Sequence, residues 1–566
     1  MIALVLAITA GAQTLNVRVG SVTYQFPAKQ TGEMTYADGQ TLTIMGKAFT
    51  LADIDEMTVD ETTVTDDAVN VSFNGTSASV TIAGNVAQYL TPTINGAHVS
   101  IAQSDDLASE ITYTLSGTSS DGEFYMSGSY KATIEFNGLT LTNTTPVFSG
   151  AAVHIQNGKR IKVKIVSGTT NTLTDASSGS QKGCLYIKGH AEFAQKGTLN
   201  IVGHVKHGIK TGEYMTLKNA TINVTSAASD GINCSEYLLV ESGNISISGV
   251  GDNGIQCDID GDSSTGETTD HEDEDSGNIY IEGGTLNVTT TATGGKGIKA
   301  DGDLRISDGT ITVRAEGSNE GSSGGGPGGG GWPGGGGWPW GGGGGGSTTE
   351  HSYAKGVKAE GNITITGGIL NVYSANHEGL ESKGTIDISG GEVSIQASDD
   401  AINAASHMTI SGGYVLAYST GNDGLDSNGN MYIKGGLVYA IGKSSPEVAI
   451  DANTEGGYKL YITGGTIIAI GGLENGSSLT QSCYSASSWS KNTWYAITTG
   501  NETFAFKTPS SAGSGIVVSG SSKPTLMSGV TVSGGTSIFG GMGNISPTVS
   551  GGSSVSLSTY TSGGRR

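Results

Sequence analysis

The sequence is poor in charged residues, cysteine and proline. Charged residues make up 14% of the 566 residues, and the chain has only 4 Cys and 10 Pro. So few cysteines exclude a small scaffold held together by disulfides. So little proline, without glycine at every third position, excludes collagen. The residues that dominate coiled coils and large helical proteins, such as Ala, Glu, Lys and Leu, do not dominate here.

Glycine and acidic residues are what the sequence has in excess. There are 93 Gly, while 35% of the residues are hydrophobic and recur in order, which argues against general disorder. This composition predicts a turn-rich, all-β protein. With 29 Lys and Arg against 52 Asp and Glu, the net charge is −23. Such a surface repels phosphate backbones, so we expect no nucleic-acid partner. Its carboxylates make Ca²⁺ a candidate ligand.

The amino terminus has the pattern of an export signal. Residues 2–9 are an apolar run, and Ala10-Gly11-Ala12 fits the small-x-small pattern of a cleavage site. No basic residues precede the run, so we interpret residues 1–12 as a truncated signal peptide. The location predicted from it is secreted, periplasmic or at the cell surface. No later stretch approaches the roughly 20 apolar residues of a membrane span, so none is expected.

A four-residue pattern repeats along the middle of the chain: glycine (alanine in one copy), an aliphatic residue, a polar residue and usually a small residue. Five of the seven spacings between copies are 22 or 23 residues, and the other two are 43 and 59. Each unit adds two short alternating runs, typical of strands with one buried face, and Gly-Gly pairs at tight corners. The tetrads begin at residues 208, 231, 254, 297, 356, 379, 401 and 424.

Three short strands per unit, with no helix between them, predict a parallel β-helix (a solenoid). Its coils stack about 4.8 Å apart and its equivalent positions form ladders. A β-sandwich of regular strands is the alternative, but it would not keep a polar position in phase over this distance. We expect residues 13–66 to form a small N-terminal β region, 67–475 the β-helix, with inserts at about 258–276 and 317–352, and 476–566 a C-terminal β cap.

Several strings together resemble a family of bacterial carbohydrate-binding domains. They are Tyr113–Gly117, Ile134–Leu141, Thr170–Asp175 and the Gly-Ile-Lys-Ala-Asp-Gly units, and the resemblance covers roughly residues 67–475. It implies a right-handed parallel β-helix that binds acidic pectin-type polysaccharide (polygalacturonate) and contains Ca²⁺. The coils are also similar to those of calcium-dependent pectate lyases.

Two positions of each unit are expected to face outward: the third residue of the tetrad, and the residue before its glycine. The aliphatic residue between them faces inward, because side chains alternate along a strand. The two positions are three residues apart, so the glycine must bend the chain if both are to face outward. In two adjacent coils the positions are basic, and we predict that they bind the carboxylates of an anionic sugar chain. These residues are Lys296, Lys299, Lys355 and Lys358.

The next coils are acidic at the same positions. A single Asp or Glu on a strand is ordinarily a solvated side chain, but like charges in register on neighbouring strands repel one another. A bound Ca²⁺, which takes six to eight oxygen ligands, explains such stacking best. The predicted metal ligands are Glu378, Glu381, Asp399, Asp400, Asp423, Asp426 and Asp451.

The two inserts and two cysteines carry further expectations. The acidic first insert has two interpretations, a second Ca²⁺ site or a flexible charged loop. The Gly-rich second insert contains Trp332, Trp338 and Trp340, which stack on sugars in one interpretation and belong to a tether in the other. Cys234 and Cys257 occupy the same position in neighbouring coils, and we expect buried free thiols rather than a disulfide.

Three functions remain open from the sequence. The first is an exported protein that binds acidic polysaccharide on a calcium-bearing face. The second is a pectate-lyase-like enzyme acting by β-elimination, with Lys299 or Lys358 as the base and Ca²⁺ acidifying the sugar C5 proton. The third is a surface adhesin or structural β-helix without chemistry.

Overall fold

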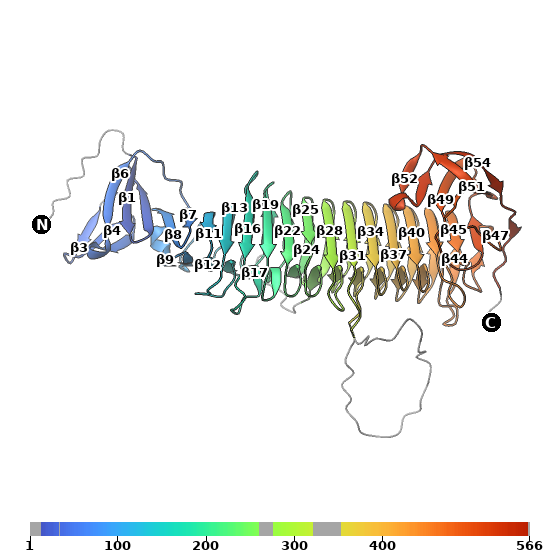
Figure 1. Cartoon of the computed structure of the whole chain (residues 1–566). Coiled ribbons are helices and arrows are strands. Elements are labelled where there is room, and N and C mark those ends of the chain that lie inside the picture. The colour runs from blue at the N-terminus through green and yellow to red at the C-terminus, as the bar shows by residue number, and fades with distance from the viewer. Residues whose placement is uncertain (1–12, 33, 260–274, 321–351, 564–566) are drawn as a thin grey trace, which may run out of the picture.

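The computed structural model describes residues 13–32, 34–259, 275–320 and 352–563. Within these ranges the protein is all-β, as predicted, with no α-helix and three short 3₁₀ turns, η1 (Leu51–Asp53), η2 (Ala87–Tyr89) and η3 (Phe539–Gly541). Figure 1 shows an elongated molecule: a small group of N-terminal strands, a long stack of coils and a C-terminal sheet beside the last coils. No helix in these ranges has the length and hydropathy needed to cross a membrane. The predicted signal peptide, most of the first insert and the three tryptophans lie outside the described residues.

One ladder of strands contains the tetrads, and we call it the tetrad sheet. Its strands pair in register, so that Lys299 of one unit lies beside Lys358 of the next. The strands are parallel, except that β9 pairs antiparallel with β10 at the N-terminal edge. In the described residues its strands are β9 (Leu90–Asn95), β10 (His98–Gln103), β12 (Glu123–Ser127), β14 (Val153–Gln156), β17 (Gly183–Ile187), β20 (His207–Thr211), β23 (Ile232–Ser235), β26 (Ile255–Asp258), β29 (Ile298–Ala300), β32 (Val357–Ala359), β35 (Leu380–Ser382), β38 (Ile402–Ala404) and β41 (Leu425–Ser427).

Two further parallel ladders complete each unit. The second ladder consists of β15 (Ile161–Ile165), β18 (Ala191–Ala194), β21 (Met215–Leu217), β24 (Tyr237–Val240), β27 (Asn278–Ile281), β30 (Leu304–Ile306), β33 (Ile363–Ile365), β36 (Ile386–Ile388), β39 (Met408–Ile410), β42 (Met431–Ile433), β44 (Leu460–Ile462) and β46 (Ser478–Leu479). The third ladder consists of β16 (Thr170–Thr174), β19 (Thr198–Val202), β22 (Thr221–Ser226), β25 (Asn244–Ile247), β28 (Thr285–Thr290), β31 (Thr310–Ala315), β34 (Ile369–Ser374), β37 (Glu392–Ala397), β40 (Tyr414–Ser419), β43 (Leu437–Ile441) and β45 (Thr466–Ile470).

The N-terminal strands join the stack through β13 (Ala132–Thr142), which pairs with both β15 and β16. β1 pairs antiparallel with β2 and β6, and β2 pairs parallel with β8. These strands are β1 (Thr14–Val19), β2 (Val22–Pro27), β3 (Thr35–Ala37), β4 (Thr41–Ile44), β5 (Lys47–Thr50), β6 (Glu56–Asp60), β7 (Ala68–Asn74), β8 (Ser77–Ala83) and β11 (Ile111–Ser119).

The interior between the ladders is filled by rows of aliphatic side chains, which explains the residue types of the tetrad. The aliphatic tetrad residues Ile298, Val357 and Leu380 are buried in these rows. Glycine opens the tetrad because a Cβ at Gly356 would lie 2.2 Å from Cγ1 of Val372, on the third ladder. The Gly-Gly corners are equally constrained. Gly413 has a φ of 77°, and a Cβ there would lie 2.8 Å from the carbonyl oxygen of Gly390.

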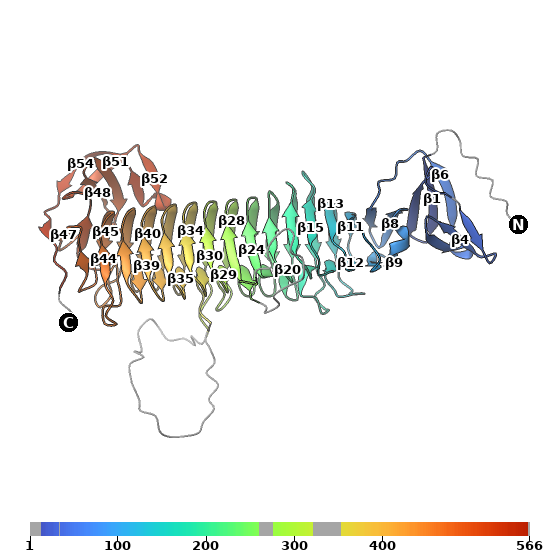
Figure 2. The ribbon, with the colours of Figure 1, turned by 180° about the vertical axis from the view of Figure 1, so that it is seen from behind.

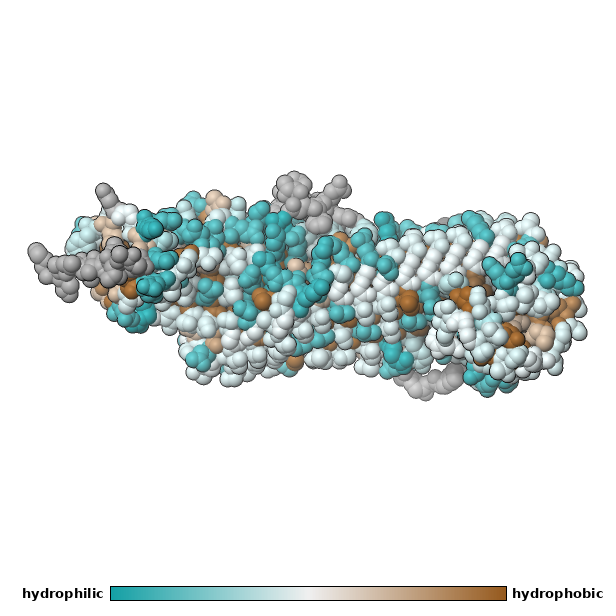
Figure 3. Space-filling model, turned by 90° about the horizontal axis from the view of Figure 1, so that it is seen from above, coloured by the Kyte–Doolittle hydropathy of each residue, from teal (hydrophilic) through white to brown (hydrophobic). Residues whose placement is uncertain are grey.

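The coil surface is regular where these small residues dominate. Seen from above, pale ridges cross the middle of the stack, while hydrophilic side chains gather over its N-terminal half (Figure 3). Cys234 of β23 and Cys257 of β26 pair in register, and both are buried free thiols, as predicted.

The C-terminal strands cover the last coils in two ways. β50 pairs antiparallel with β45 and β47, which closes the exposed edge of the sheet. A six-stranded antiparallel sheet packs on the outer face of the third ladder, where the Phe506 and Tyr439 rings lie 5.1 Å apart; Figures 1 and 2 show it beside the last coils. The six-stranded sheet consists of β48 (Trp494–Thr499), β49 (Glu502–Lys507), β51 (Thr525–Ser533), β52 (Thr536–Ile538), β53 (Gly543–Ile545) and β54 (Thr548–Ser554). The other C-terminal strands are β47 (Cys483–Ala486), β50 (Ile516–Ser519) and β55 (Ser558–Thr559).

Candidate functional site: the polar rows of the tetrad sheet

The two polar positions of each unit form two neighbouring rows on the outer side of the tetrad sheet, which we call the polar rows. Asn403 shows that the rows adjoin, because its Nδ2 donates to Asp400 Oδ2 at 3.0 Å and to Asp426 Oδ2 at 2.9 Å. The two polar positions of a unit, although three residues apart, therefore lie on the same side of the sheet, as predicted from a bend of the chain at the first tetrad residue.

The rows are more deeply buried than an open outward ladder would be. Lys355, Glu378, Glu381, Asp400 and Asp423 are all less than 9% exposed. These positions lie on the outer side of the sheet, but they are not solvated. The side chains pack against one another along the rows, so their charges act over short distances in a partly dehydrated environment.

The lysines of the basic coils are mostly engaged in ion pairs. Lys299 Nζ lies 2.8 Å from Asp301, and Lys358 Nζ lies 2.5 Å from Glu360. Burial alone lowers the pKa of Lys299, but the ion pair with Asp301 and other nearby carboxylates raise it overall. Each carboxylate directly follows its tetrad, so these pairs are local.

Lys296 differs from the other three lysines of the basic coils, because it forms no ion pair among the described residues. Its Nζ donates to the carbonyl of Gly294 at 2.8 Å and to Ser352 Oγ at 2.5 Å. Burial, and then the positive charge of Lys358, lower its pKa. Ser352 lies at the end of the second insert and Asp258 at the start of the first, so the ends of both inserts adjoin these basic coils.

The junction between the basic and acidic coils is a buried ion-pair network. Lys355 Nζ lies 2.5 Å from Glu381 and 3.2 Å from Glu378. Burial raises the pKa of Glu381, but Lys355 and then Lys383 lower it overall, so it is ionised. Glu378 and Glu381, predicted as metal ligands, are thus the partners of a lysine. His377 contacts Glu378 and lies 3.4 Å from Asp399; burial and the charge of Lys355 lower its pKa to about 4.

The acidic coils beyond this junction bring together Asp400, Asp423, Asp426 and Asp451, which we call the acidic cluster. A bridge between Leu425 and Ile450 places Asp451 in register with Asp426, so Asp451 extends the row as predicted. In the described residues no Lys, Arg or His forms an ion pair with any of the four.

The carboxyl groups of the acidic cluster resist ionisation. Burial raises the pKa of Asp423 to about 8, with a further rise from the charge of Asp426. Burial and neighbouring carboxylates raise the pKa of Asp426 to about 6, and burial together with Glu474 raises the pKa of Asp451 to about 9. The pKa of Asp400 is also well above its ordinary value, through burial and Asp426. Near neutral pH, a bound cation favours the fully charged form of such a group of carboxylates.

Sequence reasoning missed two members of this region, Glu447 and Glu474. A bridge between Ile450 and Leu473 makes Glu474 the next residue of the row after Asp451. The signal was present, because Gly472-Leu473-Glu474 repeats the start of the tetrad 23 residues after Asp451. Glu447 had no such signal. It lies in a connection that breaks the period, and its charge raises the pKa of Asp423 and Asp426.

Comparison with known proteins identifies the family of the chain. A family model described as "carbohydrate-binding domain-containing protein" matches residues 95–401 and 359–536. A protein of that description from Acetivibrio thermocellus is 26% identical over 109 residues, which are 18% of this chain and 37% of that protein's length. A solved structure of a polysaccharide lyase-like protein from C. thermocellum, a gadolinium derivative, aligns with a TM-score of 0.35 and 21% identity, over 44% of this chain and 92% of that one. Because the ranges of the family model together span more than half of the sequence, the chain belongs to the family of carbohydrate-binding domain-containing proteins.

Proposed function

We propose that this protein is exported and binds an acidic polysaccharide of the pectin or polygalacturonate type along its tetrad sheet, with Ca²⁺ held at the acidic cluster. Membership of a carbohydrate-binding family supports a polysaccharide as the partner. The observation that carries the calcium part is the convergence of four aspartates, two buried and two half-buried, with raised pKa values on consecutive coils.

The donor set of the acidic cluster fits Ca²⁺. Asp400, Asp423, Asp426 and Asp451 offer only oxygen ligands, which hard cations prefer, and Asp399 and Glu474 lie beside them. A divalent cation also removes the repulsion that raises these pKa values, since it favours the charged form of every carboxylate near it. Glu378 and Glu381 are excluded from our proposed ligand set because Lys355 holds them.

The basic coils complete the proposed polysaccharide site. Lys299 and Lys358 keep 21% and 16% of their side chains exposed, and each is paired with a carboxylate that an anionic sugar can replace. A row of cations continuing into a cation-bearing acidic cluster suits a linear polyanion that lies along the coils.

We further infer that the three ladders wind as a right-handed parallel β-helix. Each unit contributes one strand to each ladder in turn, and adjacent units pair in parallel. Connections between parallel strands of one sheet are right-handed in almost all proteins, because of the twist of the strands.

A lyase is the second candidate function, and its base differs from the one that the sequence predicted. Lys299 has a raised pKa, so it holds its proton near neutral pH. Lys358 is ion-paired with Glu360. Lys296 has a lowered pKa and no ion pair among the described residues, so it is the better base for abstraction of a sugar proton.

The two functions are separated by one experiment on the full chain. The protein is mixed with polygalacturonate, with and without Ca²⁺, and both co-sedimentation and the absorbance of unsaturated products are followed. We expect Ca²⁺-dependent co-sedimentation without absorbance, and loss of binding in Asp423→Asn. The matched control is Asp387→Asn, an exposed aspartate on β36. Rising absorbance that Lys296→Ala abolishes supports the lyase. Binding that does not respond to Ca²⁺ contradicts the calcium part of the proposal. If the protein neither binds nor cleaves polygalacturonate, both functions are contradicted, and the role as an adhesin or structural β-helix remains.

A further inference from the structure

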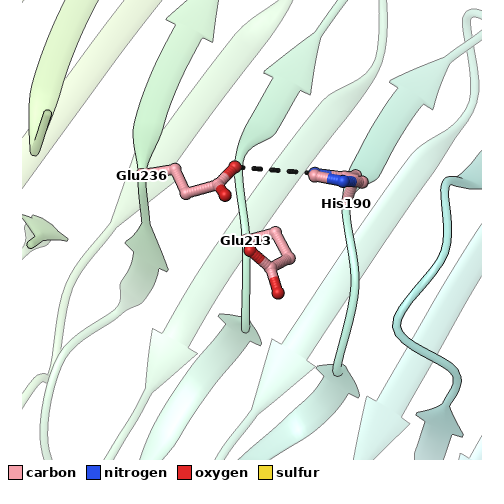
Figure 4. A group of neighbouring side chains, drawn as sticks. All are labelled: His190, Glu213 and Glu236. Atoms are coloured by element: carbon pink, nitrogen blue, oxygen red, sulfur yellow. Dashed lines mark ion pairs between the residues drawn. The ribbon is translucent and has the colours of Figure 1, made fainter. Parts of the chain in front are cut away.

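A second group of side chains lies away from the polar rows, where the chain turns from the tetrad sheet into the second ladder. His190 precedes β18, Glu213 lies two residues before β21, and Glu236 precedes β24. They come from three successive coils and are spaced by 23 residues, the period of the repeat. Figure 4 shows the His190 ring and the Glu236 carboxylate pointing toward each other, with Glu213 from the coil between them.

The ligand atoms of these three residues converge. One ring nitrogen of His190 and one carboxylate oxygen from each glutamate all lie within 4.8 Å of one another. His190 Nδ1 is 3.6 Å from Glu236 Oε2. The group is also dehydrated, with 1% of His190, 9% of Glu213 and none of Glu236 exposed.

The imidazole is held in place by a stack of aromatic rings. The His190 and Tyr214 rings are stacked with centroids 4.2 Å apart, and Tyr214 stacks on Tyr237 at 4.9 Å. The backbone N–H of Tyr214 also donates to Glu236 Oε2 at 3.2 Å. Ligands whose orientation is fixed before binding lose little entropy when a metal arrives.

The two glutamates repel each other when both are ionised. Pairing of Met215 with Leu238 places Glu213 and Glu236 in register on neighbouring coils. Like charges at such positions repel, and burial increases the repulsion. A divalent cation bound between them balances both carboxylates and gains a nitrogen ligand from His190.

We propose that His190, Glu213 and Glu236 form a binding site for a first-row divalent transition metal such as Zn²⁺. One nitrogen and two carboxylate ligands suit Zn²⁺, while Ca²⁺ and Mg²⁺ prefer oxygen ligands alone. Three protein ligands leave a coordination position for water or another donor. This site lies several coils N-terminal to the acidic cluster and is independent of the proposed calcium function.

The test measures metal directly. The full chain is stripped with a chelator, and binding of Zn²⁺, Co²⁺ and Ca²⁺ is followed by calorimetry and elemental analysis. We expect one tight Zn²⁺ site in the wild type, weakened at least about tenfold in both His190→Gln and Glu236→Gln. His207→Gln is the matched control, since His207 is a buried histidine of the same coils but pairs with Asp230 at 3.1 Å. Asp423→Asn should leave Zn²⁺ binding unchanged.

The proposal is overturned if the wild type binds no transition metal, if it prefers Ca²⁺ at this site, or if both variants bind Zn²⁺ as the wild type does. If the variants do not fold, as judged by circular dichroism, the visible spectrum of the Co²⁺-loaded wild type tests the proposed site instead. Absorption typical of a low-coordinate site with a nitrogen ligand supports the site, and the spectrum of hydrated Co²⁺ overturns it.

Discussion

At the scale of single residues, the acidic cluster makes folding depend on pH. The pKa of Asp423 is raised to about 8 and that of Asp451 to about 9, whereas a carboxyl group of the unfolded chain titrates near ~4. Between these values the folded protein holds more protons than the unfolded chain. The free energy of unfolding must therefore fall as the pH rises through this range.

We predict that the chelator-treated protein loses stability between about pH 5 and pH 9, by an amount on the order of a few kcal/mol. Ca²⁺ should restore stability at pH 8, because it favours the charged carboxylates of the folded state alone. The measurement is the melting temperature against pH, with a chelator and with Ca²⁺. Asp423→Asn should flatten the profile and reduce the calcium effect, and the exposed Asp387→Asn should do neither. A flat wild-type profile contradicts the prediction.

The sequence could place these residues but not their pairings. Alternation along the strands and the repeat of the tetrad put Asp400 and Asp426 on one side of the sheet. The rows are buried, and Lys355 pairs with Glu381, because side chains of neighbouring coils pack against one another. The period of the sequence does not predict this packing. His190 and Glu236 escaped notice for another reason, since they lie outside the tetrad, although they keep its spacing.

At the scale of the element, the tetrad glycine is a packing requirement. At Gly356 a Cβ would meet Cγ1 of Val372 at 2.2 Å and the carbonyl oxygen of Gly379 at 2.5 Å. This close approach explains why glycine recurs in the tetrads, and this recurrence made the repeat recognisable in the sequence. A residue type that recurs because backbones and side chains pack there gives a signal in nearly every coil, and the smallest side chain, alanine, replaces it at Ala401.

We predict that Gly356→Ala lowers the free energy of unfolding by about 1–3 kcal/mol, the usual range for forcing one extra carbon into a packed interior. The measurement is urea unfolding followed by circular dichroism. Gly158→Ala is the matched control, because a Cβ there meets no atom within 4 Å, and its effect should be small. Equal effects of the two substitutions contradict the packing argument.

At the scale of the whole molecule, each coil contacts chiefly its neighbours, so stability is local along the stack. Ladder strands pair with the preceding and the following unit, as β33 does with β30 and β36. The C-terminal sheet adds a second anchor only at the last coils, where Phe506 packs on Tyr439. Ligands bound at different coils should therefore stabilise different parts of the chain.

Hydrogen exchange measured along the chain tests this locality together with both proposed metal sites. Removal of Ca²⁺ should speed exchange mainly in β38, β41 and the following coils, because the repulsion returns there and local opening is favoured. Removal of Zn²⁺ should speed exchange mainly in β18, β21 and β24. Asp423→Asn should abolish the first response and leave the second, and Glu236→Gln should do the reverse. Uniform changes along the whole stack would mean that the coils unfold as one cooperative unit, and changes confined to other coils would mean that the metals bind elsewhere.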